Sequence, residues 1–364
     1  MIISPRRQRL ARLLGLMERG GVDALLVTHI PNVFYLSGFT GDSGALLVEH
    51  TRATLLTDSR FTTQAGEELA PTRIGLKIVK GPLAAAAGAE LVRRRFRGRA
   101  AFEGARVTVS EAARLRKASG GKVRWRPVVG WVEQLRRVKD GDEIERMREA
   151  ARLGSKVIVE VLSLIRPGVR ECDLAAEIEF RMRRGGASGP AFETIVASGV
   201  RGALPHARAT TKAFRPNELV VIDMGAILRH YCSDLTRTVY LGRATARVRR
   251  WYRAVAEAQA AACQALRPGA PCSAPDSAAR EVLRGYGLET AFIHSTGHGL
   301  GIEVHEEPRL GRGQSLPLDA SSVVTIEPGV YLEGAGGIRV EDDVLVLPDG
   351  PELLTDAPRD FLEL

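Results

Sequence analysis

Short apolar runs separated by turn-forming residues mark the first third of the chain. Residues 24–27, 45–48 and 54–56 are such runs, and the segments between them have helical character. Ahead of these runs, large apolar residues recur at helical spacing: Leu10, Leu13, Leu14 and Met17. We therefore expect a first helix within residues 1–20, followed by an α/β domain.

A polar, charged stretch then interrupts the pattern. Residues 136–142 read Arg-Arg-Val-Lys-Asp-Gly-Asp, which is typical of a link between domains. The chain has 364 residues, too many for one ordinary core. The sequence therefore predicts two domains, residues 1–135 and 136–364.

The second domain contains an internal echo. A helical pattern over 144–165 stops at Arg-Pro-Gly, and a shorter helix follows it. A second helical pattern, over 248–266, also stops at Arg-Pro-Gly before a shorter helix. Each copy then leads into strands, so we expect two halves related by a pseudo-twofold repeat.

Matching strands of the two halves supply carboxylates. Asp223 follows the apolar run 219–222, and Glu327 follows the run 323–326. A further strand in each half carries one more acid, Asp234 in the first and Glu341 in the second. Carboxylates that met about 4 Å apart would repel by about 4 kcal/mol per pair at an effective dielectric of 20. Bound cations would remove that cost.

Histidines cluster near the second pair of acids. Of the 7 histidines in the chain, His294, His298 and His305 fall within residues 293–306. A straight strand would place His298 and His305 on opposite faces, but the glycines at 297, 299 and 301 make a bulge easy. Four carboxylates and the imidazole of His298 suit two divalent ions such as Mn²⁺, Co²⁺ or Zn²⁺.

Together these motifs resemble the pita-bread metallopeptidases, in particular the proline-specific branch that contains prolidase and aminopeptidase P. The resemblance rests on Asp223, Asp234, the His298 segment, residues 327–329 and residues 339–342. Residues 32–41 and 55–60 are similar to the creatinase-type N-terminal domain of that branch. The implied fold is a creatinase-like α/β domain followed by a pita-bread domain, an α/β (α+β) architecture.

The resemblance also implies a ligand set for two divalent metal ions, with Mn²⁺ expected and Co²⁺ or Zn²⁺ as alternatives. Asp223 would bind one ion, and His298 with Glu327 would bind the other. Asp234 and Glu341 would bridge them. Water held between two such ions can reach a pKa near 7, and we expect it to attack the carbonyl that precedes proline.

Further residues match family positions on the substrate side. His206 and His305 are expected to stabilise the oxyanion, and Glu327 is expected to carry a proton to the leaving nitrogen. His294 and Arg339 match positions near the proline pocket and the metal ligands, and we assign them to substrate binding. The implied activity is metal-dependent hydrolysis of the bond between an N-terminal residue and proline.

Composition limits the partners. The chain has 52 basic and 43 acidic residues, a net charge of +9, but its densest arginine run, residues 93–99, has no stacking platform around it. Nucleic acid is therefore disfavoured, and no stretch is apolar enough for a membrane span. Four cysteines without a C-x-x-C pair fit a cytoplasmic protein. We expect small proline-containing peptides as substrates and a homodimer as the assembly.

Two other functions use the same fold. One is a metal-free amidinohydrolase like creatinase, and the other is a noncatalytic pita-bread module that binds peptides or proteins. Both branches lose metal ligands, whereas this chain keeps all five. Within the preferred interpretation, a dipeptidase acting on Xaa-Pro and an aminopeptidase acting on longer peptides share one ligand set, so the sequence leaves that choice open.

Overall fold

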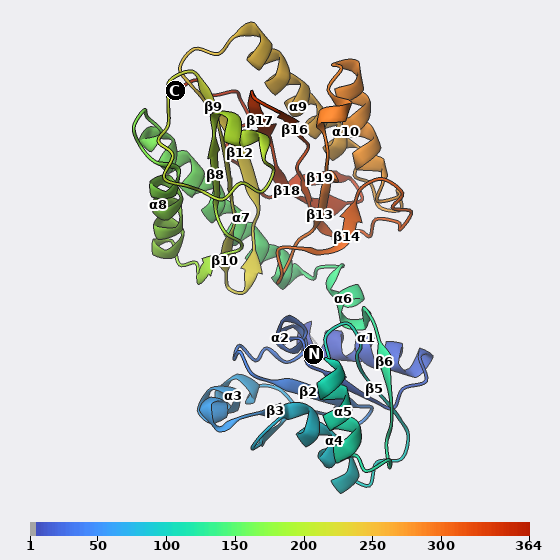
Figure 1. The fold of residues 1–364 in the computed structure, drawn as a ribbon. Coiled ribbons are helices and arrows are strands. Elements are labelled where there is room, and N and C mark those ends of the chain that lie inside the picture. The colour runs from blue at the N-terminus through green and yellow to red at the C-terminus, as the bar shows by residue number, and fades with distance from the viewer. Residues whose placement is uncertain (1–4) are drawn as a thin grey trace. The chain divides into compact units, whose positions relative to one another are not determined.

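The computed structural model describes residues 5–364 and divides into two compact units, one ending at Arg136 and one spanning Arg137–Leu364 (Figure 1). The expected first helix is α1, Pro5–Arg19. The first four residues of the expected helical segment lie outside the described part of the chain.

The first unit is built on a mixed sheet with the strand order β4-β3-β2-β1-β5-β6. Its strands are β1 Ala24–Val27, β2 Ala45–Glu49, β3 Arg52–Thr57, β4 Gly75–Ile78, β5 Arg99–Glu103 and β6 Arg124–Val128. Strand β1 runs antiparallel to β2 and parallel to β5. The three apolar runs expected to form strands are β1, β2 and β3.

Helices cover this sheet with alanine and leucine side chains. Besides α1 they are α2 Ile30–Ser37, α3 Thr62–Leu69, α4 Leu83–Arg93, α5 Val109–Ala118 and α6 Trp131–Arg136, with the 3-10 helix η1 Ser59–Phe61. Helices α4 and α5 bury Ala87, Leu91, Ala112 and Leu115 in one cluster with strand residues such as Leu47. Burial of this apolar surface holds the unit together.

The first half of the second unit places two helices before an antiparallel sheet of order β12-β9-β8. Its main elements are α7 Gly141–Val161, α8 Glu171–Arg184, β8 Ile195–Ser198, β9 Glu218–Met224 and β12 Leu235–Leu241. Shorter elements are η2 Leu162–Leu164, β7 Gly189–Pro190, η3 Gly199–Ala203, β10 Ala226–Leu228 and β11 Tyr231–Cys232. Helices α7 and α8 share a hydrophobic core with β9 and β12.

The second half repeats this plan with a sheet of order β14-β13-β15-β18-β19. Its elements are α9 Ala246–Gln264, α10 Ala274–Gly285, η4 Glu289–Ala291, β13 Gly297–Gly299, β14 Glu306–Leu310, β15 Val323–Ile326, β18 Asp342–Leu347 and β19 Gly350–Leu353. A hairpin of β16 Gly329–Leu332 and β17 Gly336–Arg339 lies between β15 and β18 in the chain. Helices α9 and α10 have a core of their own.

Matched glycines lie in the turn between the long helix and the shorter helix of each half. Gly168 and Gly269 follow the two Arg-Pro pairs with φ angles of 93° and 84°. Glycine adopts this left-handed conformation at little cost, so the chain can turn sharply toward the next helix. The internal echo expected from the sequence is thus present in the backbone. Across residues 5–364, no helix combines the length and apolar character needed to cross a bilayer.

Candidate metal centre

The four acids occupy different positions relative to their strands. Asp223 lies within β9, opposite Thr236 of β12. Asp234, Glu327 and Glu341 instead lie at strand ends, immediately before β12, after β15 and before β18. The expectation that Asp234 and Glu341 sit inside strands was therefore wrong. At such a break the backbone forms a hydrogen bond outside the regular strand pairing: Glu341 N–H donates to the Thr236 carbonyl over 3.2 Å.

Residues far apart in the sequence converge at this point. Asp234, His298 and Glu341 each offer one ligand atom, and these atoms all lie within 4.8 Å of one another. His298 Nε2 is also 3.5 Å from Glu327 Oε1 and 3.8 Å from Asp234 Oδ2. Four of the five expected metal ligands therefore share one site.

The fifth, Asp223, borders the same site. Its Oδ2 accepts a 2.6 Å hydrogen bond from Arg339 Nη2. Its negative charge contributes to raising the pKa values of Asp234 and Glu341, which places it within electrostatic range of both. Asp223 Oδ1 and Asp234 Oδ1 are buried and have no hydrogen-bond partner within residues 5–364. Such orphaned acceptors fit a bound cation.

The glycines around His298 allow its strand to be closely packed and irregular. The register of β13 against β14 shifts between His298 and Gly299, which is the bulge expected from the sequence. A Cβ at Gly297 would lie 1.9 Å from the Thr325 carbonyl oxygen, so only glycine fits there. As a result, the centroids of the His298 and His305 rings lie 4.4 Å apart.

Hydrogen bonding decides which nitrogen of His298 faces the acids. Nδ1 lies 3.0 Å from the Gly299 carbonyl oxygen, which can only accept a hydrogen bond. Nδ1 therefore carries the proton, and the lone pair of Nε2 is directed toward Asp234 and Glu327. A backbone carbonyl that fixes the tautomer in this way is a common arrangement for metal-binding histidines.

Burial makes the charged forms of these groups costly. It raises the pKa of Asp234 and Glu341 well above the usual range, with neighbouring carboxylates adding to the effect. Burial also raises the pKa of Glu327 to about 7 and lowers the pKa of His298 to about 4. Divalent cations would stabilise the carboxylates and the neutral imidazole together, so the residues fit such ions.

A chain of hydrogen bonds connects Asp223 to Arg339, Tyr331 and His294. Arg339 donates from Nη2 to Asp223 and from Nη1 to the Tyr331 hydroxyl over 2.7 Å. Tyr331 in turn lies 2.8 Å from His294 Nε2, while His294 Nδ1 lies 2.8 Å from the Ser295 carbonyl oxygen. Because that carbonyl only accepts, His294 Nε2 accepts from Tyr331.

His206 and His305, the two other histidines expected at the site, are exposed. His206 follows η3. The pKa of His294 is lowered to about 4, mainly by burial and in part by the charges of Arg339 and His206. His206 also lowers the pKa of His305, so it lies within electrostatic range of both histidines.

Three supporting residues were missed by the sequence analysis. Thr236 donates its hydroxyl to Glu341 Oε2 over 2.5 Å, Thr325 Oγ1 accepts from His298 N–H over 3.1 Å, and Tyr331 joins His294 to Arg339. Each lies within five residues of an expected ligand, and this proximity in the sequence could have marked them as candidates. Their partners come from other strands, however, so local sequence could not identify them.

Comparison with known protein families assigns both parts of the chain. Residues 145–348, more than half of the chain, match metallopeptidase family M24. The chain belongs to this family. Residues 9–138 match the creatinase/prolidase N-terminal domain, so the resemblance and the fold class expected from the motifs are confirmed.

Several relatives of this M24 chain match it along nearly its whole length. An Xaa-Pro dipeptidase of Pyrococcus furiosus is 35% identical over 98% of this chain and 100% of its own. The structure of an Xaa-Pro dipeptidase from Bacillus anthracis has a TM-score of 0.94 at 33% identity, covering 99% of this chain and 100% of that one. An X-Pro aminopeptidase from Thermotoga maritima has a TM-score of 0.89 at 37% identity, covering 98% and 99%.

Proposed function

We propose that this M24 metallopeptidase hydrolyses the peptide bond between an N-terminal residue and proline. The observation that carries the proposal is the convergence of Asp234, His298 and Glu341 within 4.8 Å, with Glu327 beside them. The printed names of its relatives, Xaa-Pro dipeptidase and X-Pro aminopeptidase, support the choice of substrate.

The ligand roles implied by the resemblance are supported by the convergence of the acids and by the tautomer of His298. Asp223 would hold one divalent ion, His298 Nε2 and Glu327 the other, with Asp234 and Glu341 shared between them. Such ions lower the pKa of water toward about 7 and polarise a carbonyl oxygen. Mn²⁺ is the proposed occupant because carboxylate-rich sites favour hard divalent ions.

Other side chains of this chain handle the substrate and its protons. His206 and His305 are exposed and lie within electrostatic range of each other, where they can donate hydrogen bonds to a developing oxyanion. Glu327, at the end of β15, is the proposed group that passes a proton to the departing imino nitrogen of proline.

His294 and Arg339 are proposed to shape the substrate side in different ways. Arg339 is 3% exposed and donates to Asp223, Tyr331 and the Pro205 carbonyl, one residue before His206. It would therefore support substrate binding by holding the segments that carry His206 and His294. His294 is half-buried and ends the same hydrogen-bond chain.

The finer assignments are proposals that rest on the sequence patterns and on the resemblance. They are a creatinase-type domain over residues 1–135, a catalytic domain over 136–364, a homodimer and a cytoplasmic location. Light scattering on the purified full chain tests the dimer, because one protomer has a mass of 39.4 kDa and a dimer twice that.

A product assay tests the activity. Protein loaded in turn with Mn²⁺, Co²⁺ or Zn²⁺ is incubated with Ala-Pro and Ala-Pro-Ala, and the products are identified by mass spectrometry. We expect release of alanine from Ala-Pro, with Ala-Ala as the uncut control. Cleavage of the tripeptide would identify an aminopeptidase. If every metal leaves both prolyl peptides intact, the proposed function is wrong.

A further inference from the structure

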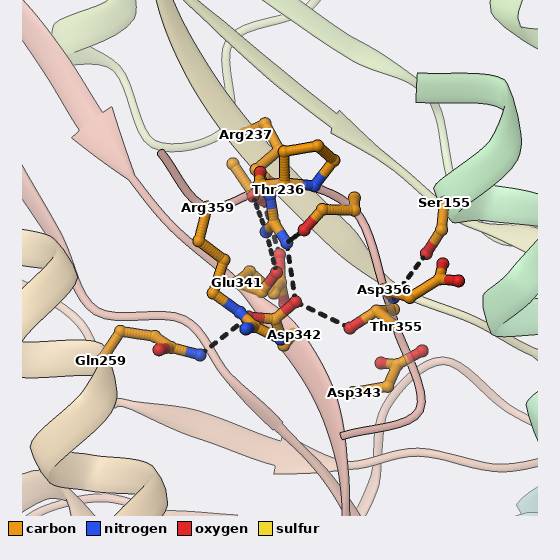
Figure 2. A network of polar contacts seen from close by, with 12 residues as sticks. Ser155, Thr236, Arg237, Gln259, Glu341, Asp342, Asp343, Thr355, Asp356 and Arg359 are labelled. Carbon is orange, nitrogen blue, oxygen red and sulfur yellow. Dashed lines mark hydrogen bonds and ion pairs between the residues drawn. The ribbon is translucent and has the colours of Figure 1, made fainter. Parts of the chain in front are cut away.

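A buried ion pair lies directly behind the candidate metal centre. Asp342 follows Glu341 at the start of β18 and is 0% exposed, while Arg237 lies on β12, three residues after Asp234, and is 4% exposed. Adjacent residues of an extended chain point to opposite faces, so Asp342 points away from the side on which Glu341 meets the other acids. Figure 2 shows polar side chains converging on Asp342 from several segments.

Both carboxylate oxygens of Asp342 accept hydrogen bonds from side chains of the protein. Its Oδ1 accepts from Arg237 Nη2 over 2.8 Å and from Thr355 Oγ1 over 2.7 Å. Its Oδ2 accepts from Gln259 Nε2 over 2.9 Å and from Arg359 Nε over 2.7 Å. The carboxylate is thereby fixed from helix α9, strand β12 and the C-terminal segment (Figure 2).

Arg237 extends this network to the backbone of a proposed metal ligand. Its Nη1 donates to the Glu341 carbonyl oxygen over 2.6 Å and to the Thr236 carbonyl oxygen over 2.9 Å. Its Nε and Nη2 donate to the carbonyl oxygens of Pro358 and Ala357. One guanidinium of the first half therefore holds both Glu341 and Asp342 of the second.

Thr236 completes the connection on the site-facing side. Its carbonyl accepts from Glu341 N–H over 3.2 Å, and its hydroxyl donates to Glu341 Oε2 over 2.5 Å. The backbone position of Glu341 relative to the strand that follows Asp234 is thus set by contacts at Thr236 and Arg237. Displacement of either contact would move one acid relative to the other.

The pair is not a general requirement of this fold. The residue three positions after Glu341, which corresponds to Arg237, is Val344. The residue after Asp234, which corresponds to Asp342, is Leu235. Both are 0% exposed, so the repeated strands can bury apolar side chains at these positions. A buried ion pair usually adds little stability over an apolar pair of similar volume. Stability therefore does not account for this pair, whereas its effect on the geometry of the site can.

We propose that Arg237 and Asp342 are positioning residues that set the separation of the Asp234 and Glu341 carboxylates and so determine metal affinity. This inference rests on the metal-dependent function proposed above. Both side chains are buried. They act through the Glu341 backbone, as the outer hydrogen bonds of metal sites commonly do.

Arg237→Lys tests the geometric part of the proposal. Lysine keeps the charge, but its single ammonium cannot reproduce the planar fork that reaches Asp342 and the Glu341 carbonyl together. Binding of Mn²⁺ to the metal-free full chain is measured by titration calorimetry, and unfolding of the metal-free protein by urea. We expect the Kd for Mn²⁺ to rise about 10–100-fold. An unchanged Kd would overturn the proposal.

A double apolar variant separates positioning from stability. Arg237→Met/Asp342→Leu removes both charges, so we expect metal-free protein that is more stable than Asp342→Leu alone, in which Arg237 is left buried and unpaired. The Kd for Mn²⁺ should nevertheless remain raised. If affinity recovers together with stability, the pair is only structural and the proposal fails. Should the double variant not fold, Arg237→Lys still decides the question.

A control comes from a second, more exposed ion pair in the same unit. Arg148 of α7 donates to both oxygens of Glu352 on β19, over 3.0 and 2.9 Å, and contacts none of the four acids. Glu352→Gln should leave the Kd for Mn²⁺ unchanged. The inference and the proposed function fail differently: wild-type protein that binds Mn²⁺ but cleaves no prolyl peptide contradicts only the function, whereas equal Mn²⁺ affinity of Arg237→Lys and wild type contradicts only the inference.

Discussion

The two halves of the Arg137–Leu364 unit share a plan but differ in how they hold their histidines. In each half, an acid near the start of the second helix is buried, Glu171 of α8 and Asp276 of α10. Glu171 accepts from Ser198 and Thr210, which flank the His206 segment on its two sides. Asp276 instead accepts from Thr296, two residues before His298.

Asp276 also acts through a neighbouring arginine. It pairs with Arg280 over 2.7 Å, and Arg280 donates to the carbonyl oxygens of Phe292 and His294. The first half therefore clamps the segment that carries the exposed His206, and the second half anchors the strand that carries a proposed metal ligand. The repeat supplies a common scaffold, while the side chains near the helix starts adapt it to different tasks.

Removing one shared acid from each half should have the largest effect. Asp234→Asn and Glu341→Gln should each lower turnover by at least about 100-fold, because each replaces a charged ligand proposed to serve both ions. Metal content by mass spectrometry and turnover of Ala-Pro are measured together. Full activity with unchanged metal content in Asp234→Asn would exclude the proposed mechanism.

Changing the two helix-start acids should separate their roles. Asp276 holds Thr296, and the carbonyl of Thr296 accepts a 2.8 Å hydrogen bond from the N–H of Glu327, a proposed metal ligand. Asp276→Asn is therefore expected to weaken Mn²⁺ binding. Glu171→Gln is expected to lower kcat about tenfold with metal content unchanged, because His206 would be misplaced. Calorimetry and steady-state kinetics measure the two effects. Identical behaviour of both variants would remove the functional distinction between the halves.

Acid stability should reveal the clamp of the first half. Burial alone would raise the pKa of Glu171, but hydrogen bonds from Thr210 and Ser198 lower it below the ordinary glutamate value. Its stabilising effect is therefore present above the unfolded pKa of about 4.3 and is lost as pH falls through the lower folded value.

Urea unfolding of wild type and Glu171→Gln from pH 7 to pH 3 measures this dependence. At pH 7, the variant should be less stable by about 2 kcal/mol, since glutamine cannot accept all the hydrogen bonds that the carboxylate accepts. The difference should narrow below about pH 4. A gap that stays constant with pH would show that folding does not lower the pKa of Glu171.

An exposed pair in the first half should give the smallest effect. Glu149 of α7 accepts from Arg229 Nη1 over 2.9 Å, and their side chains are 33% and 49% exposed. Glu149→Gln should change the free energy of unfolding by no more than about 1 kcal/mol and leave metal affinity unaltered. A large loss of Mn²⁺ binding here would mean that the site responds to any change in the first half.

Much of the fold followed from local pattern. The apolar runs at 24–27, 45–48 and 54–56 are strands, and both Arg-Pro-Gly stops end long helices. These features depend on side-chain periodicity and on backbone conformations within a few residues. The match between the halves then identified the acids, because equivalent positions in two repeats can be recognised from the sequence without knowing how far apart the side chains lie in space.

Other features depended on segments far apart in the chain. The sequence placed Asp234 and Glu341 within strands, but contacts with other segments put them at breaks beside Thr236. The tautomer of His298 and the role of Tyr331 likewise depend on tertiary contacts.

By itself, the sequence determined the element types, the internal repeat and the chemical character of the five expected ligands, because those are properties of neighbouring residues and of composition. Only the tertiary structure decided that Arg237 would reach across the repeat to Asp342 and the Glu341 carbonyl. Such contacts join residues more than 100 positions apart, and their geometry is set by how β12 and β18 are packed rather than by either strand alone.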